Sequence, residues 1–473
     1  MLCLLLDTTL PFVGAVTLSG LSFTLFCICV LAVLGFEVIN GFHDTANAVA
    51  TVIYTNTLKP TVAIIWSGFW NFIGVFVIGT AVAMSLLKLV PLDAFIRLPV
   101  HVGASLVLAV LMASIIWNLS TWYVGLPLSS SHTLIGALIG ASLGFSTYYG
   151  GNVNWAQAKE IGLSLLLSPI IGFVGSLLLL YGEKKVLKNS LLFRAPSHDH
   201  EHPPLPIRLL LVTTCTLVSF FHGSNDGQKG VGLLMLVLIT FLPARFALNP
   251  DTSPTQLNTL LLNTEQLLHQ TRPSTPTQAT RLTQAERATS QLRQQVRQHQ
   301  GQQTREQYAL RREFQHLTTQ LKTITDESNT ALPADVRARL NEQIRQLDKA
   351  TDFAPIWVLV AISLSLGLGT MIGWRRIVTT IGERIGNEHL TYAEGATAEL
   401  VAASTIGLST LAGLPVSTTH VLSSGVAGAM VASGGTKNLN YGTLRNIAVA
   451  WLLTVPAAIG LAYALFLAFH RWL

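Results

Sequence analysis

Two aspartates stand inside apolar stretches of this sequence, where a charged side chain is costly. Asp44 lies in NGFHDTANAVAT and Asp226 lies in HGSNDGQKGVGL, with apolar residues before and after each motif. A carboxylate at the centre of a bilayer costs about 2.5–3.5 kcal/mol on insertion scales, so such residues usually mark ion or substrate paths. The alternative is a carboxylate that caps a helix at the membrane surface. Because the Asp motif occurs twice, we favour the ion or substrate path.

Polar residues accompany both aspartates. Asn47 follows Asp44 by three residues and Lys229 follows Asp226 by three, so each pair shares a helix face if its segment is helical. Histidines beside the Asp motifs and in the hydroxyl-rich stretches are interpreted either as packing residues or as proton-linked groups. Glutamates within or at the edge of apolar segments either belong to an ion path or pair with a neighbour. These residues are His43, His132, His222, His420, Glu37 and Glu399.

Two hydroxyl-rich stretches repeat each other. GLPLSSSHTLIGALIG begins at Gly125, GLPVSTTHVLSSGVAG begins at Gly413, and the two align over sixteen residues without a gap. The Gly and Pro break the helix, so a half-helix is expected to begin at the hydroxyls after the break. Hydroxyls and free N–H groups at a helix start can bind an anion, although Ser and Thr also serve as caps and packing residues. The hydroxyl residues are Ser129, Ser130, Ser131, Ser417, Thr418 and Thr419.

The Asp motif precedes the hydroxyl motif twice, which indicates an internal duplication. Asp44 lies 88 positions before His132, and Asp226 lies 194 positions before His420. The difference of 106 positions is close to the 102 residues of the polar stretch Pro250–Thr351. The chain is therefore predicted to contain two equivalent halves, with an insertion in the second. Duplicated halves with interrupted apolar segments are typical of secondary transporters, whose site lies between the repeats.

The charges of these groups indicate what the site would bind. Hydroxyls and helix N-termini favour an oxyanion, but two carboxylates in the same site would repel it at low dielectric. Cations must therefore lie between the anion and the carboxylates, or protons must neutralise the carboxylates. The anion should enter only with a cation, and Lys229 would supply one permanent positive charge beside Asp226. Protonated phosphate can donate a hydrogen bond to an aspartate, which sulfate at neutral pH cannot.

The composition is that of a membrane protein. Half of the 473 residues are hydrophobic and 11% are charged, whereas soluble domains carry about 25% charge. The long apolar runs are Leu21–Val38, Thr61–Leu87, Val102–Val124, Ile161–Leu180, Leu209–Phe221, Ile356–Ile372 and Ile447–Phe469. The shorter ones are Ala46–Leu58, Thr133–Phe145, Val231–Leu242, Leu400–Leu411 and Val421–Val431. We expect an all-α polytopic membrane protein with about 10–12 membrane segments, some of them re-entrant.

Two polar regions interrupt this pattern. The linker 183–208 contains three histidines, His198, His200 and His202, which suit a metal but are more typical of a solvated linker. The stretch 250–352 is rich in Gln, Arg, Thr and Glu with apolar residues at helical spacing, which predicts a helical hairpin outside the membrane. The expected organisation is a first membrane repeat at 1–182, the linker at 183–208, a second repeat at 209–249 and 353–473, and the insertion at 250–352.

At these motifs the sequence resembles the inorganic phosphate transporter (PiT) family, in particular its bacterial low-affinity Pit type. The resemblance rests on the ordered pairs of Asp and GLP motifs and extends to IWNLSTWYVGLP and GTMIGWRRIVTTIGERIG. It implies two inverted repeats with broken helices, phosphate import across the cytoplasmic (inner) membrane, and a homodimer. It places these residues around phosphate and its coupling cations: Asp44, Asn47, Ser129, Ser130, Ser131, Asp226, Ser417, Thr418 and Thr419.

One residue departs from the sodium-coupled relatives, which have Asn three residues after the second Asp. This chain has Lys229 there, which argues against a second sodium site and favours proton coupling. A further hypothesis is that phosphate crosses as a neutral complex with a divalent metal. We expect the partners to be inorganic phosphate, a coupling cation and the lipid bilayer. We expect no catalytic residue, resident metal, cofactor or nucleic-acid partner.

Other functions fit parts of the sequence. A carrier of another tetrahedral oxyanion, such as sulfate or arsenate, would use the same hydroxyls and amides, and sodium-coupled phosphate symport would use the same carboxylates. A channel would need neither the balance of anion and carboxylates nor a duplicated broken-helix site. A membrane hydrolase would need a third group to orient the adjacent Ser131 and His132, and the sequence offers no obvious candidate.

Overall fold

The computed structural model describes residues 5–10, 14–77, 79–95, 98–187, 191–196, 202–271, 273, 275–298, 306–326, 333–372 and 375–473. Helices dominate these residues, which confirms the all-α prediction. The exception is a hairpin of β1 (Leu5–Leu10) and β2 (Gly14–Ser19), paired antiparallel with Leu5 opposite Ser19. This hairpin is not part of the predicted architecture.

The chain divides into two compact units. The membrane unit comprises Met1–Val237 and Pro355–Leu473, and the helical unit comprises Leu238–Ala354. The bounds of the helical unit lie near those of the insertion expected at 250–352. The division of the remaining chain into two inverted repeats stays a prediction.

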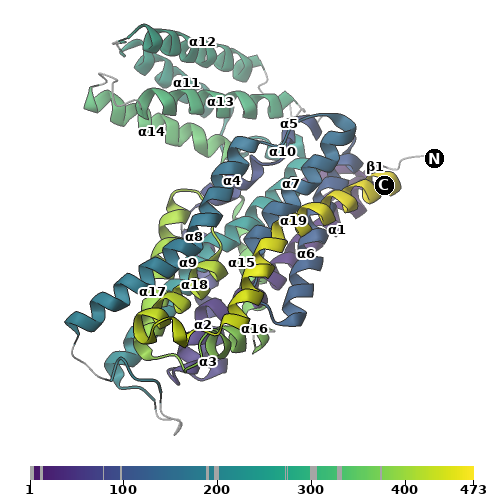
Figure 1. Ribbon diagram of the computed structural model, residues 1–473. Helices are drawn as coiled ribbons and strands as arrows, with labels where there is room; N and C mark the ends of the chain where they lie inside the picture. Colours follow the sequence, from purple (N-terminus) through teal and green to yellow (C-terminus); the bar gives the residue numbers. More distant parts are fainter. Residues whose placement is uncertain are drawn as a thin grey trace. The chain divides into compact units, whose positions relative to one another are not determined.

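Long apolar helices form the membrane unit (Figure 1). Among the described residues, six helices are long and apolar enough to cross a membrane. They are Gly20–Tyr54, which comprises α1 (Gly20–Asp44) and α2 (Ala46–Tyr54), and α3 (Pro60–Val77), α6 (Val100–Val124), α8 (Trp155–Val186), α9 (Leu205–Phe241) and α19 (Tyr441–Trp472). The shorter elements are α4 (Ala81–Leu87), α5 (Leu92–Phe95), α7 (Ser130–Tyr149), α15 (Ile356–Thr370), α16 (Arg375–Thr379), η1 (Thr380–Arg384), α17 (Tyr392–Leu411), α18 (Thr418–Gly434) and η2 (Thr436–Asn438).

Both GLP motifs are helix breaks with nearly the same backbone. Gly125 and Gly413 have φ of 76° and 70°, in the left-handed region that glycine enters without a Cβ clash. Ser129 and Ser417 then cap α7 and α18, and each hydroxyl accepts the N–H of the residue three positions on. The prediction that a half-helix begins at each hydroxyl cluster is therefore confirmed.

Each half-helix packs on a long helix of the other predicted repeat. Gly140 on α7 lies against the backbone of Ile459 on α19, and Gly428 on α18 lies against the backbone of Phe173 on α8. Figure 1 shows α7 running beside α19 and α18 beside α8. The half-helix of each predicted repeat is thus packed on the last long helix of the other, and both contacts rely on a glycine.

We expect Gly140→Ala to destabilise the protein. A Cβ at Gly140 would lie 2.2 Å from the carbonyl oxygen of Ile459, so α7 and α19 would have to separate. Overpacking of this kind costs about 1–3 kcal/mol. Gly162→Ala on α8 is the matched control, because nothing lies within 4 Å of its added Cβ. Thermal unfolding of the purified variants in detergent checks this, and equal unfolding temperatures would contradict the close packing.

In the described part of the helical unit there are four long helices, not the predicted hairpin. After the short α10 (Pro243–Phe246) come α11 (Pro254–His269), α12 (Pro276–Gln298), α13 (Glu306–Asp326) and α14 (Ala334–Thr351). Each of these four packs on two of the others, around apolar residues such as Leu261, Leu292, Phe314 and Leu340. The hairpin prediction was wrong because the apolar spacing of α11 and α14 also buries a helix face, so two more helices join the core.

Candidate substrate and ion site

Asp44 lies where the two half-helices begin. It is the last residue of α1, and α2 starts after Thr45. The hydroxyl of Ser130 donates to its Oδ2 at 2.9 Å, and the hydroxyl of Thr419 donates to its Oδ1 at 2.7 Å. All three side chains are buried. One carboxylate therefore joins the starts of α7 and α18, as a site shared by two halves requires.

Asp226 forms a buried ion pair with Lys229. The ammonium Nζ lies 2.6 Å from Asp226 Oδ1, and both residues are on α9. Lys229 also donates to the hydroxyl of Ser131, which itself donates to the carbonyl of Val416 at 2.7 Å. The ammonium thus stands between the second carboxylate and a hydroxyl of the first GLP motif. A buried ion pair of this kind holds its geometry because breaking it leaves a charge without compensation.

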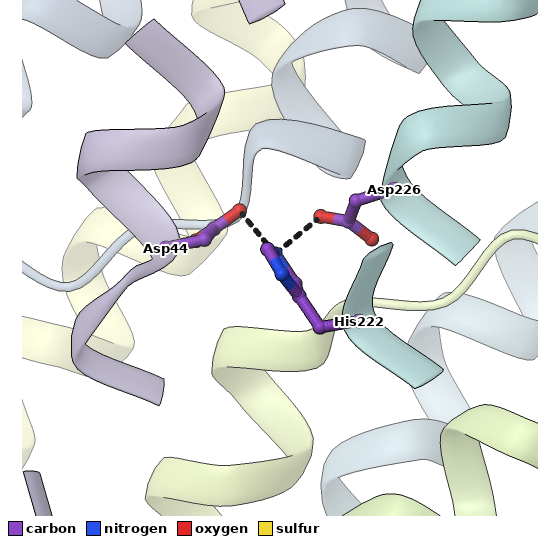
Figure 2. A group of neighbouring side chains, drawn as sticks. All are labelled: Asp44, His222 and Asp226. Carbon is purple, nitrogen blue, oxygen red and sulfur yellow. Dashed lines mark ion pairs between the residues drawn. The ribbon is translucent and has the colours of Figure 1, made fainter. Parts of the chain in front are cut away.

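His222 connects the two aspartates. Its Nε2 lies 3.9 Å from Asp44 Oδ2 and 3.4 Å from Asp226 Oδ2, and Figure 2 shows the ring lying between the two carboxylates. On its other side, Nδ1 lies 3.0 Å from Oδ1 of Asn71. The ligand atoms of Asp44, His222 and Asp226 are all within 4.8 Å of one another, a spacing that can hold a metal ion. The two aspartates thus converge on one buried polar centre.

The remaining predicted residues lie at the helix starts or on α2. The hydroxyls of Ser129 and Ser417 accept helix N–H bonds, so they cap the half-helices and act on the site through them. Thr418 is buried in the first turn of α18. Asn47 belongs to α2, and its side chain lies outside the described residues. The structure therefore brings together Asp44, Ser130, Ser131, Asp226, Lys229 and Thr419.

One residue with a clear positioning role is missing from the predicted set. Asn225, buried beside Asp226, donates from Nδ2 to Thr410 Oγ1 at 2.9 Å and accepts the N–H of Val416 at 3.3 Å. It therefore ties α9 to the turn before α18. Its place next to the second Asp was the signal in the sequence, although a capping or packing role is equally common for Asn.

A buried polar centre between broken helices is the arrangement of a secondary transporter. Two carboxylates and one ammonium leave a formal charge of one negative when both carboxylates are ionised and the histidines are neutral. The chain belongs to the phosphate transporter family, whose family model matches residues 40–462.

Full-length relatives support this membership. The chain is 38% identical to the low-affinity inorganic phosphate transporter PitA of Escherichia coli, over 96% of each chain. It is 29% identical to the probable low-affinity inorganic phosphate transporter of Bacillus subtilis, over 90% of this chain and 92% of that protein. Among solved structures, a sodium-dependent phosphate transporter has a similar fold with a TM-score of 0.55 at 20% identity, covering 95% of this chain and 100% of the other.

Proposed function

We propose that this protein imports inorganic phosphate across the cytoplasmic (inner) membrane by symport with a cation, and that the cation is a proton. The observation that carries the proposal is the position of Asp44, which accepts a hydrogen bond from a hydroxyl group at the start of each half-helix. An anion bound at these hydroxyls must lie against a carboxylate. Because like charges repel strongly at low dielectric, a cation or proton must accompany the anion.

The contacts of this structure indicate how phosphate would be held. The hydroxyls of Ser130 and Thr419 donate to Asp44 in this structure. Phosphate entering between α7 and α18 would take these donors and the free N–H groups of the helix starts. A proton on the phosphate would donate to Asp44 in return, which a fully deprotonated tetrahedral anion cannot do. This exchange of partners favours phosphate over sulfate.

The buried Asp44, His222 and Asp226 cluster suits a divalent cation that travels with phosphate. In this extension of the proposal the metal is cargo, not a resident ion. Its two positive charges would balance a doubly ionised phosphate in a neutral complex and would lie between the phosphate and the carboxylates. A homodimer remains an expectation from the family resemblance.

Uptake of radiolabelled phosphate into proteoliposomes tests the proposal. We expect an inward proton gradient to drive accumulation, an imposed sodium gradient to have no effect, and Mg²⁺ to raise the rate if the metal complex is the cargo. Competition with unlabelled sulfate and arsenate reports on the other oxyanions. Uptake driven only by sodium, or preferred uptake of sulfate, would overturn the proposal.

Lys229→Asn is expected to make uptake respond to sodium. The ammonium occupies the space between Asp226 and Ser131, so its removal exposes a carboxylate and a hydroxyl that suit a small cation. We expect uptake that rises with sodium and depends less on pH than that of the wild type. Lys159→Asn on α8, an exposed lysine, is the control. An unchanged ion dependence in Lys229→Asn would refute the role of the ammonium as a built-in cation.

A further inference from the structure

Glu37 is a buried carboxyl group of the membrane unit that lies outside the set of site residues described above. Glu37, seven residues before Asp44 on α1, has no exposed surface. Its Oε2 accepts a single long hydrogen bond, at 3.4 Å, from the side-chain amide of Asn40. Within the described residues, Glu37 Oε1 and Asn40 Oδ1 have no hydrogen-bond partner. A buried carboxylate with one weak donor is costly, so the ionised form of Glu37 lacks the hydrogen bonds or the positive charge that would stabilise it.

The fold makes room for this carboxyl group. A Cβ at Gly230 on α9 would lie 2.4 Å from Glu37 Oε1, so the side chain of Glu37 rests against the backbone of Gly230. Gly230 directly follows Lys229, so the ion pair of Lys229 with Asp226 lies in the turn of α9 immediately before Gly230. Glu37 is thus positioned against the helix that carries the second half of the site.

One proton would satisfy both unpartnered oxygens. A proton on Glu37 Oε1 makes that oxygen a donor, and Asn40 Oδ1 can accept from it while Asn40 Nδ2 still donates to Glu37 Oε2. We propose that Glu37, with Asn40 as its partner, binds the proton that is coupled to phosphate uptake; this rests on the proposed proton symport. The proton binds the carboxylate when the site is open to the outside and leaves the carboxyl group when the site is open to the inside.

The charged surroundings of Glu37 come mainly from α9. His222, Asp226 and Lys229 act on it electrostatically from that helix. Its own helix carries His43 and Asp44 further on. Of the other helices packed against α1, α15 has no ionisable residue. The ionisable residues of α2, α6 and α7 are Tyr54, His101, Tyr123, His132, Tyr148 and Tyr149. Movement of Lys229 toward phosphate would leave Asp226 uncompensated and favour the protonated form of Glu37, which links the proton to the anion.

Glu37→Gln tests the inference because the amide is a neutral group of nearly the same shape that can donate to Asn40. In proteoliposomes with the membrane potential held at zero, one coupled proton gives about tenfold accumulation of the transported species per pH unit. We expect the wild type to reach about this ratio and Glu37→Gln to stay near unity, while both exchange labelled for unlabelled phosphate at similar rates. Glu160→Gln, an exposed carboxyl on α8, should behave as the wild type.

The outcomes separate this inference from the proposed function. A wild type that shows no proton-driven accumulation overturns the proposed proton symport, and the assignment of Glu37 with it. A Glu37→Gln variant that accumulates phosphate like the wild type overturns the assignment of Glu37 alone. If Glu37→Gln also lacks phosphate exchange, the Glu37→Asp variant, which keeps a carboxyl group, is measured in the same two assays. Proton-driven uptake with a shifted pH profile supports the inference, and loss of both driven uptake and exchange overturns it.

Discussion

Replacing Asp44 with asparagine is expected to reduce phosphate uptake at least about 100-fold while the protein remains folded. Asp44 accepts the hydroxyls of Ser130 and Thr419, one from each half-helix. Hydrogen bonds to a charged group contribute about 1.5–3 kcal/mol each, and every 1.4 kcal/mol is about tenfold. Asparagine keeps the shape of the side chain but loses the negative charge that would bind the coupled proton or cation.

The measurement for Asp44→Asn is initial uptake in proteoliposomes, with gel-filtration elution and thermal unfolding to show that the variant is folded. Asp251→Asn, at an exposed position of the helical unit, is a control for the loss of an aspartate. If the folded Asp44→Asn variant takes up phosphate at the rate of the wild type, Asp44 has no part in transport.

Asp226→Asn is expected to abolish uptake and also to weaken the fold. It leaves the ammonium of Lys229 buried with no carboxylate at the 2.6 Å position. Removing one member of a buried pair costs about 3–5 kcal/mol, so the unfolding temperature should fall as well as the transport rate. Uptake assays and thermal unfolding of the same preparation measure both effects.

The double variant Asp226→Asn with Lys229→Asn separates the two effects of Asp226→Asn. Because it removes both charges, we expect its unfolding temperature to recover toward that of the wild type while uptake stays lost. Recovery of uptake together with stability would mean that Asp226 serves only to neutralise Lys229. Equal unfolding temperatures for all variants would contradict the buried ion pair.

The half-helix starts could be predicted because their causes are local. Gly125 and Gly413 free the backbone, and Ser129 and Ser417 cap the helices that begin after them, so the break and the cap can both be read from neighbouring residues. The repeated order of the motifs then indicated that the two halves share one site. The contact of Asp44 with hydroxyls of both motifs agrees with that reasoning.

The remaining features depend on long-range packing that the sequence does not encode locally. His222 lies between the two aspartates only because α9 is continuous through Asp226 and its register places this ring toward α1. Asn225 ties α9 to Val416, which lies 191 positions along the chain. The four-helix core of the helical unit likewise required α11 and α14, the first and last of its long helices, to pack together.

The exchanged packing of the half-helices has a consequence for biogenesis. The segment α7 is synthesised early, yet its glycine-lined face rests on α19, the last helix in the sequence. During synthesis, this face of α7 is therefore not covered by α19 until that helix has also been made and inserted. We therefore expect that neither predicted half would complete its part of the buried polar centre if it were produced alone.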